Sequence, residues 1–150
     1  MYFALESKAW TGGMSFYDPT SDGSTAARAY LITLGQFSDI AAQEMYQEPG
    51  KDFDLSAVFS SGRVELGAGR YETLIYSGEL DGHPVLTFTA PWSIRDVAKS
   101  KPTAQYLAYL ASGLKESHGW SAREVAEYLV ACPGAKETWT VGEIERMLMK

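Results

Sequence analysis

The stretch RYETLIYSGELDGHPVLTFTA, residues 70–90, decides the fold. Two runs rich in β-branched and aromatic residues, 70–80 and 84–90, flank the dipeptide Asp81-Gly82. This dipeptide between two apolar runs is a strong signal for a tight β-hairpin turn. The sequence therefore predicts two antiparallel strands in the middle of the chain.

Short strands are also expected on the N-terminal side of this hairpin. Apolar or aromatic runs punctuated by Gly, Asp and Ser clusters predict strands over residues 2–5, 14–17 and 25–32. Thr33 and Gln36 then have the spacing of a capping box, and Pro49-Gly50 closes the segment, which predicts a helix over 34–47. A short helix is expected near 54–60.

The last third of the chain has helical spacing. Pro102 suits a first helical turn, and apolar residues recur after it at positions 106, 107, 110 and 114. Two further capping boxes, Ser121 with Glu124 and Thr140 with Glu143, predict helices over about 122–131 and 141–149. Strands early and helices late indicate an α+β fold, and 150 residues suit a single domain over 1–150.

Composition narrows the class of partner. A net charge of -6 without clustered Lys and Arg argues against nucleic acid, and no apolar run is long enough to indicate a membrane partner. One cysteine, Cys132, allows no internal disulfide and fits a reducing compartment. Because the first residues also lack the pattern of a secretory signal, we expect a cytoplasmic protein.

Glu44 is the candidate for chemistry. In the helix expected over 34–47, Phe37, Ile40 and Ala41 define an apolar stripe, and Glu44 falls at the next position of that stripe. A carboxylate there would lose hydration, which raises its pKa toward the range of a general base. The alternative is that the stripe ends earlier and that Glu44 is solvated or pairs with an arginine such as Arg28 or Arg70.

Other groups are weaker candidates. His83 and His118 are not spaced as a metal pair, and together with Cys132 they provide too few ligands for a structural zinc. Cys132 is interpreted as a small apolar residue at the end of a helix. The glycines of 62–69 lack a phosphate-binding order and predict a turn. We therefore expect no metal and no cofactor.

Two ordered blocks resemble a known family. ARAYLITLGQFSDIAAQE (27–44) resembles the strand and helix of gamma-glutamylcyclotransferase-like proteins that end in a catalytic glutamate. KPTAQYLAYLASGLKESHGW (101–120) is similar to a downstream pattern of the same family, which it matches at Pro102, Tyr106, Gly113, Glu116 and Gly119. The hairpin between the blocks also looks like the family's, so the resemblance covers about residues 25–130.

The resemblance implies a fold and an activity. The implied fold is α+β, with a small mixed or antiparallel β-barrel-like sheet, a helix carrying Glu44 and C-terminal helices. The implied substrate is a small molecule with a gamma-glutamyl group, and Glu44 would be its general base and acid. Tyr71, Tyr76 and Tyr106 are candidate substrate-binding residues, with core or rim packing as the alternative.

One part of the family pattern is missing. Family members hold the glutamyl group with a Y-G-S-N-type loop after an N-terminal strand, and YFALES (2–7) is only faintly similar. The domain over 1–150 is thus expected to lack that strand and loop, and the oxyanion donors that the loop provides. The other hypothesis is a catalytically inactive member of the fold that binds a small metabolite or a protein.

Overall fold

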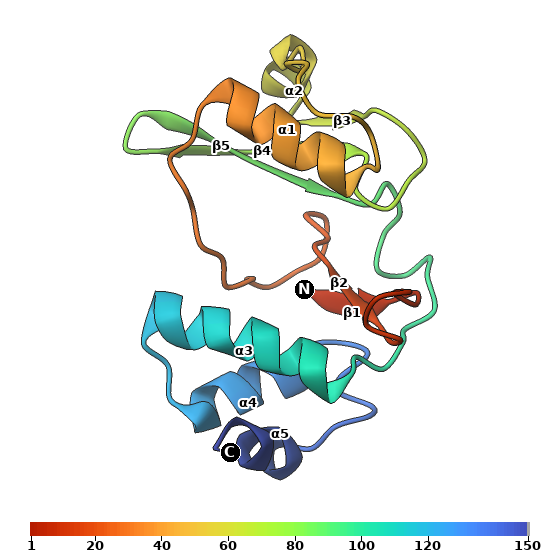
Figure 1. The fold of residues 1–150 in the computed structure, drawn as a ribbon, viewed down its shortest axis with the longest axis vertical. Helices are drawn as coiled ribbons and strands as arrows, with labels where there is room; N and C mark the ends of the chain where they lie inside the picture. The colour runs from red at the N-terminus through yellow and green to blue at the C-terminus, as the bar shows by residue number, and fades with distance from the viewer. Residues whose placement is uncertain (150) are drawn as a thin grey trace. The chain divides into compact units, whose positions relative to one another are not determined.

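The computed structural model describes residues 1–149, which form five helices and two antiparallel sheets (Figure 1). The expected α+β class is confirmed, and neither sheet closes into a barrel within the described residues. The chain divides into two compact units. Unit 1 contains residues 1–26 and the chain from Ser93 onward, and unit 2 contains Ala27–Trp92.

Unit 1 joins a small sheet to three helices. Strands β1 (Tyr2–Ala4) and β2 (Met14–Phe16) pair antiparallel, as expected from the runs at 2–5 and 14–17. The helices are α3 (Ala104–His118), α4 (Ala122–Ala131) and α5 (Val141–Leu148). The predicted capping boxes open α4 and α5, because Ser121 and Thr140 each accept from the backbone of the glutamate three residues later.

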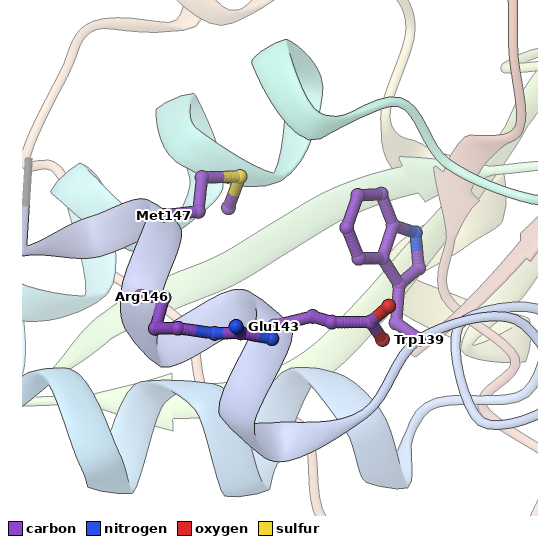
Figure 2. Close-up of a pocket in the computed structure, with 4 residues that line it drawn as sticks. All are labelled: Trp139, Glu143, Arg146 and Met147. Carbon is purple, nitrogen blue, oxygen red and sulfur yellow. The ribbon is translucent and has the colours of Figure 1, made fainter.

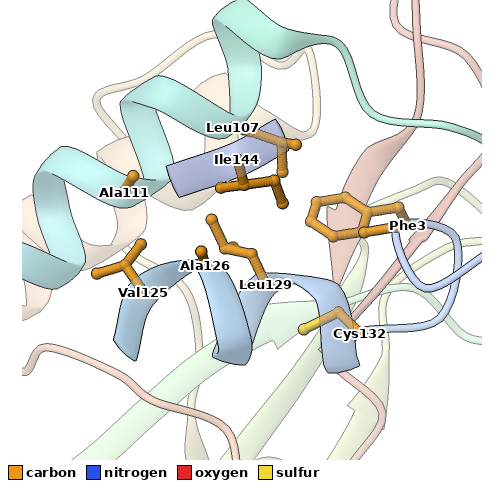
Figure 3. Close-up of a cluster of buried hydrophobic side chains, with 9 residues drawn as sticks. Phe3, Leu107, Ala111, Val125, Ala126, Leu129, Cys132 and Ile144 are labelled. Carbon is orange, nitrogen blue, oxygen red and sulfur yellow. The ribbon is translucent and has the colours of Figure 1, made fainter. Parts of the chain in front are cut away.

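The core of unit 1 lies between these helices and β1 (Figure 3). Its largest members come from β1 and from all three helices, so burial of one shared apolar cluster joins segments far apart in the sequence. The buried residues are Phe3, Leu107, Ala111, Val125, Ala126, Leu129, Cys132, Ala135 and Ile144.

Unit 2 is built on the hairpin. Strands β4 (Thr73–Leu80) and β5 (His83–Thr89) pair antiparallel, and Asp81 and Gly82 have φ values of 52° and 77°. Two consecutive left-handed residues are what a type I′ turn requires, which confirms the hairpin prediction. A third strand, β3 (Arg63–Glu65), pairs with β4 in the order β3-β4-β5 and was not predicted.

Two helices complete unit 2. Helix α1 (Leu34–Glu44) has the predicted capping box at Thr33 but ends three residues before the expected position 47. Helix α2 (Ser56–Ser61) corresponds to the short helix expected near 54–60. Figure 1 shows α1 lying across the sheet, where Phe37, Ala41, Met45, Val58 and Leu74 form the buried cluster.

Two expectations about unit 2 are wrong. The segment 25–32 is not a strand, because it has no regular structure and pairs with no described strand. The apolar stripe of α1 is also displaced: Ile40 is 47% exposed, whereas Ser38 and Ala42 are buried. The buried face of α1 is therefore centred on Phe37, Ala41 and Met45.

Candidate functional site

Glu44 is the last residue of α1 and lies outside the buried face. It shares the exposed side of the helix with Ile40, four residues earlier, so the burial expected for its carboxylate is wrong. Within residues 1–149 the Glu44 side chain makes no hydrogen bond and no ion pair. It therefore does not pair with Arg28 or with Arg70, the two partners considered from the sequence. Glu44 is thus open to solvent.

Tyr71 and Tyr76 belong to the same unit as Glu44. The Tyr76 ring lies edge-on to Phe59, with 5.4 Å between ring centroids, and packs against the cluster that α1 covers. The Tyr71 ring lies edge-on to Phe88 at 6.2 Å. Both tyrosines are half-buried.

Tyr106 lies on α3 in unit 1 and has a different environment. Its hydroxyl oxygen accepts the backbone N–H of Ser15 at 3.2 Å and lies 2.7 Å from the Ser15 Oγ atom. Its ring contacts Phe3 and Trp10. The phenol therefore joins α3 to β2, and its position in the structure has a packing explanation.

A pocket of about 300 Å³ lies beside α5 (Figure 2). Its lining consists of Trp139, Glu143, Arg146 and Met147, and Figure 2 shows the Glu143 side chain extending from α5 toward Trp139. The amino group of Lys101 lies 4.7 Å from the centre of the Trp139 ring. An aromatic ring beside charged side chains can contact a small ligand.

No motif in the sequence predicted this pocket. Glu143 is recognisable in the sequence only as the partner of Thr140 in a capping box, and hydrogen bonding to Thr140 holds the pKa of Glu143 below its ordinary value. The indole N–H of Trp139 donates to the Pro102 carbonyl oxygen at 3.0 Å. A tryptophan directly before a charged helix was the only sequence signal for the pocket.

The cysteine and the two histidines considered from the sequence lie apart from Glu44 in the sequence and have the following surroundings. Burial raises the pKa of the Cys132 thiol, whose sulfur lies 3.4 Å from the Tyr128 carbonyl oxygen. His118 stacks on Trp120 at 5.0 Å, and His83 is exposed at the start of β5. No group of three His, Cys, Asp or Glu residues that could hold a metal ion occurs in the described part of the chain.

The glycine-containing turn after β3 surrounds the carboxylate of Glu72, a residue of the same chain. Its Gly69 N–H donates to the Glu72 carboxylate at 2.6 Å, and a Cβ atom at Gly67 or Gly69 would approach that carboxylate within 3 Å. The glycines therefore lie in close contact with the Glu72 carboxylate. Among residues 1–149, no helix is long and apolar enough to cross a bilayer.

The chain was compared with known proteins in three ways. Neither family models, nor curated protein sequences, nor solved structures gave a match to the chain. The resemblance of residues 27–44 and 101–120 to gamma-glutamylcyclotransferase-like proteins therefore depends on the motifs quoted above. In the structure, the first of these segments lies in unit 2 and the second in unit 1.

Proposed function

We propose that the chain is gamma-glutamylcyclotransferase-like and cleaves a gamma-glutamyl amide by internal cyclisation, with Glu44 as general base and then general acid. The proposal includes the family's barrel-like sheet, of which β3, β4 and β5 would form part. The observation that carries it is the state of the Glu44 carboxylate. A group that transfers protons must be reached by its substrate, and this carboxylate is exposed and unpaired among the described residues.

The chemistry needs one base and no redox step. Glu44 removes a proton from the substrate's α-ammonium group, and the resulting amine attacks the γ-carbonyl carbon. A new carbon–nitrogen bond closes the five-membered ring while the proton passes through Glu44 to the departing nitrogen. The old amide bond then breaks, and the products are 5-oxoproline and a free amine.

Fixing the position of the carboxylate is the contribution of α1. The capping box at Thr33 and the burial of Phe37, Ala41 and Met45 hold the helix on its sheet. The backbone of Glu44, the last residue of the helix, is therefore fixed in position. In this proposal Tyr71 and Tyr76 contact the glutamyl group from the same unit.

The direct test is formation of 5-oxoproline. The full chain is incubated with a panel of gamma-glutamyl amines, and the product is measured by chromatography. Glu44→Gln removes the base with little change in shape, and we expect product formation to fall by roughly 100-fold or more. Glu48→Gln, the same change at a nearby exposed glutamate, is the matched control and should keep the wild-type rate. Equal rates for Glu44→Gln and wild type would reject Glu44 as the base.

A second candidate function is binding without catalysis. The observation in its favour is the pocket beside α5, because its lining residues belong to unit 1 and do not include Glu44. In that case gamma-glutamyl compounds would change the tryptophan fluorescence without being consumed. Trp139→Phe should abolish the fluorescence change, whereas the same replacement at Trp10, outside the pocket, should leave it intact.

A further inference from the structure

The C-terminal end of α1 forms a complete Schellman motif directly after Glu44. The N–H of Tyr46 donates to the Gln43 carbonyl oxygen at 3.1 Å, and the N–H of Gln47 donates to the Ala42 carbonyl oxygen at 2.8 Å. This pair of hydrogen bonds requires a left-handed residue between the end of the helix and the returning chain. Tyr46 occupies that position, with a φ of 58°.

A tyrosine is an unusual residue for this position. Its Cβ atom makes the left-handed conformation unfavourable, and glycine is the common choice. The same chain uses glycine elsewhere: α2 ends at Gly62, with a φ of 77°, and α3 ends at Gly119, with a φ of 67°. Helix α1 therefore differs from α2 and α3 in carrying a bulky side chain at its left-handed end.

Packing does not compensate for this strain. Tyr46 is 88% exposed, the largest exposed fraction among the large hydrophobic side chains of residues 1–149. Within those residues its side chain makes no ring contact and no hydrogen bond. A strained residue whose side chain stabilises nothing in the fold is an observation that calls for a role outside folding.

The position relative to Glu44 indicates the role. Two steps of about 3.8 Å place the Cα atoms of Glu44 and Tyr46 within about 7.6 Å of each other. During cyclisation both nitrogens of the substrate must meet the Glu44 carboxylate, and the glutamyl carbons close into a ring between them. The substituent on the leaving nitrogen projects away from that ring, over the surface that surrounds Glu44.

We propose that Tyr46 is a specificity-determining residue whose exposed ring contacts the substituent of the leaving amine, a role that rests on the function proposed for Glu44. The substrate class is then a gamma-glutamyl amide of an amine with an apolar or aromatic substituent. An aromatic ring accepts such a group with favourable stacking or edge contacts. The left-handed backbone holds the ring outward instead of letting it fold onto the helix.

The test compares two substrates that share the glutamyl group. Gamma-glutamylbenzylamide carries an aromatic substituent, whereas glutamine releases only ammonia, and kcat/KM is measured for both with the full chain. Tyr46→Gly and Tyr46→Asn should lower the benzylamide-to-glutamine ratio by roughly 3–10-fold, mainly through KM. Tyr46→Phe, which keeps the aromatic ring, should have the wild-type ratio. Tyr30→Gly, the same change at a tyrosine that is 66% exposed, should keep it.

Stability separates this role from a structural one. Tyr46→Gly should raise the midpoint of thermal unfolding by about 2–4 °C, because it relieves the left-handed strain, while it lowers the ratio. An unchanged ratio in an active Tyr46→Gly protein would overturn the role of Tyr46 and leave that of Glu44 intact. If the wild-type protein forms 5-oxoproline from neither substrate, the proposed function is overturned, and the role of Tyr46 with it.

Discussion

The Tyr106 hydroxyl lies 2.7 Å from the Oγ atom of Ser15 and accepts the Ser15 backbone N–H at 3.2 Å, which ties α3 to β2. The two residues are 91 positions apart in the sequence. A hydrogen bond over that separation constrains the fold of unit 1 more than a local turn does. It also means that a substrate contact by this phenol would have to share an oxygen already in use.

Tyr106→Phe should therefore lower stability. The change removes the phenol oxygen that accepts the Ser15 N–H, and we expect a loss of about 1 kcal/mol in the free energy of unfolding, measured by urea denaturation. Tyr109→Phe is the matched control, because Tyr109 is 63% exposed on the same helix. It should change stability by no more than about 0.5 kcal/mol. Equal effects at the two positions would contradict a structural role for the Tyr106 hydroxyl.

Asp18 should make unit 1 sensitive to acid. Burial alone would raise the pKa of Asp18, but hydrogen bonds from the Ile94 N–H and from Thr20 outweigh it and hold the pKa below the ordinary 3.8. A carboxyl group with a depressed pKa stabilises the folded state above its unfolded pKa. That contribution is lost as the pH falls through the folded-state value.

Asp18→Asn is the variant that tests this. We expect it to lower the free energy of unfolding at pH 7 by about 1–3 kcal/mol, since hydrogen bonds to a charged group are replaced by weaker ones. The difference from wild type should shrink as the pH falls below about 4. Urea denaturation from pH 7 down to pH 3 measures it, with Asp22→Asn in the same loop as the exposed control. A difference that does not vary with pH would exclude the carboxylate as its source.

The local signals in the sequence predicted local structure well. Capping boxes at Thr33, Ser121 and Thr140 and the hairpin turn at Asp81-Gly82 each specify backbone geometry through residues three or fewer positions apart. These features fix where helices and turns begin. They carry no information about which face of an element finds a partner elsewhere in the chain.

The two errors in unit 2 have that origin. Residues 25–32 contain Tyr30, Leu31 and Ile32, but a strand exists only if a neighbour pairs with it, and no described strand does. In α1, hydrophobicity favours Ile40 over Ser38 for the buried face. The small residues Ser38 and Ala42 are buried instead of Ile40, so the position of Glu44 could not be derived from hydrophobicity alone.

Cys132 should be protected from alkylation in the folded protein. It is the only cysteine, it is buried in the core of unit 1, and burial raises the pKa of its thiol, which lowers the thiolate fraction. We expect iodoacetamide at pH 8 to react at least about 100-fold more slowly with native than with denatured protein. Mass spectrometry gives both rates, and similar rates would show that this core is open.

Gly134 in unit 1 should not tolerate replacement by a residue with a side chain. It follows α4 with a φ of 96°, and a Cβ atom there would lie 2.6 Å from the Phe3 carbonyl oxygen and 3.0 Å from that of Ser100. The Phe3 carbonyl oxygen is itself held by a hydrogen bond, since it accepts the Ser100 N–H at 3.1 Å, and the Phe3 N–H donates to the Pro133 carbonyl oxygen at 2.8 Å. A side chain at this position must therefore displace β1 from its neighbours.

Gly134→Ala should destabilise the protein by about 2 kcal/mol or more, which corresponds to a thermal midpoint lower by roughly 4–8 °C. Gly142→Ala is the control, because Gly142 lies in α5 and a Cβ atom there meets nothing within 4 Å. Alanine favours a helix over glycine, so this variant should be as stable as wild type or more stable by up to about 1 kcal/mol. Calorimetry of both variants decides the matter: a midpoint for Gly134→Ala equal to that of Gly142→Ala would mean that β1 does not pack against the turn after α4.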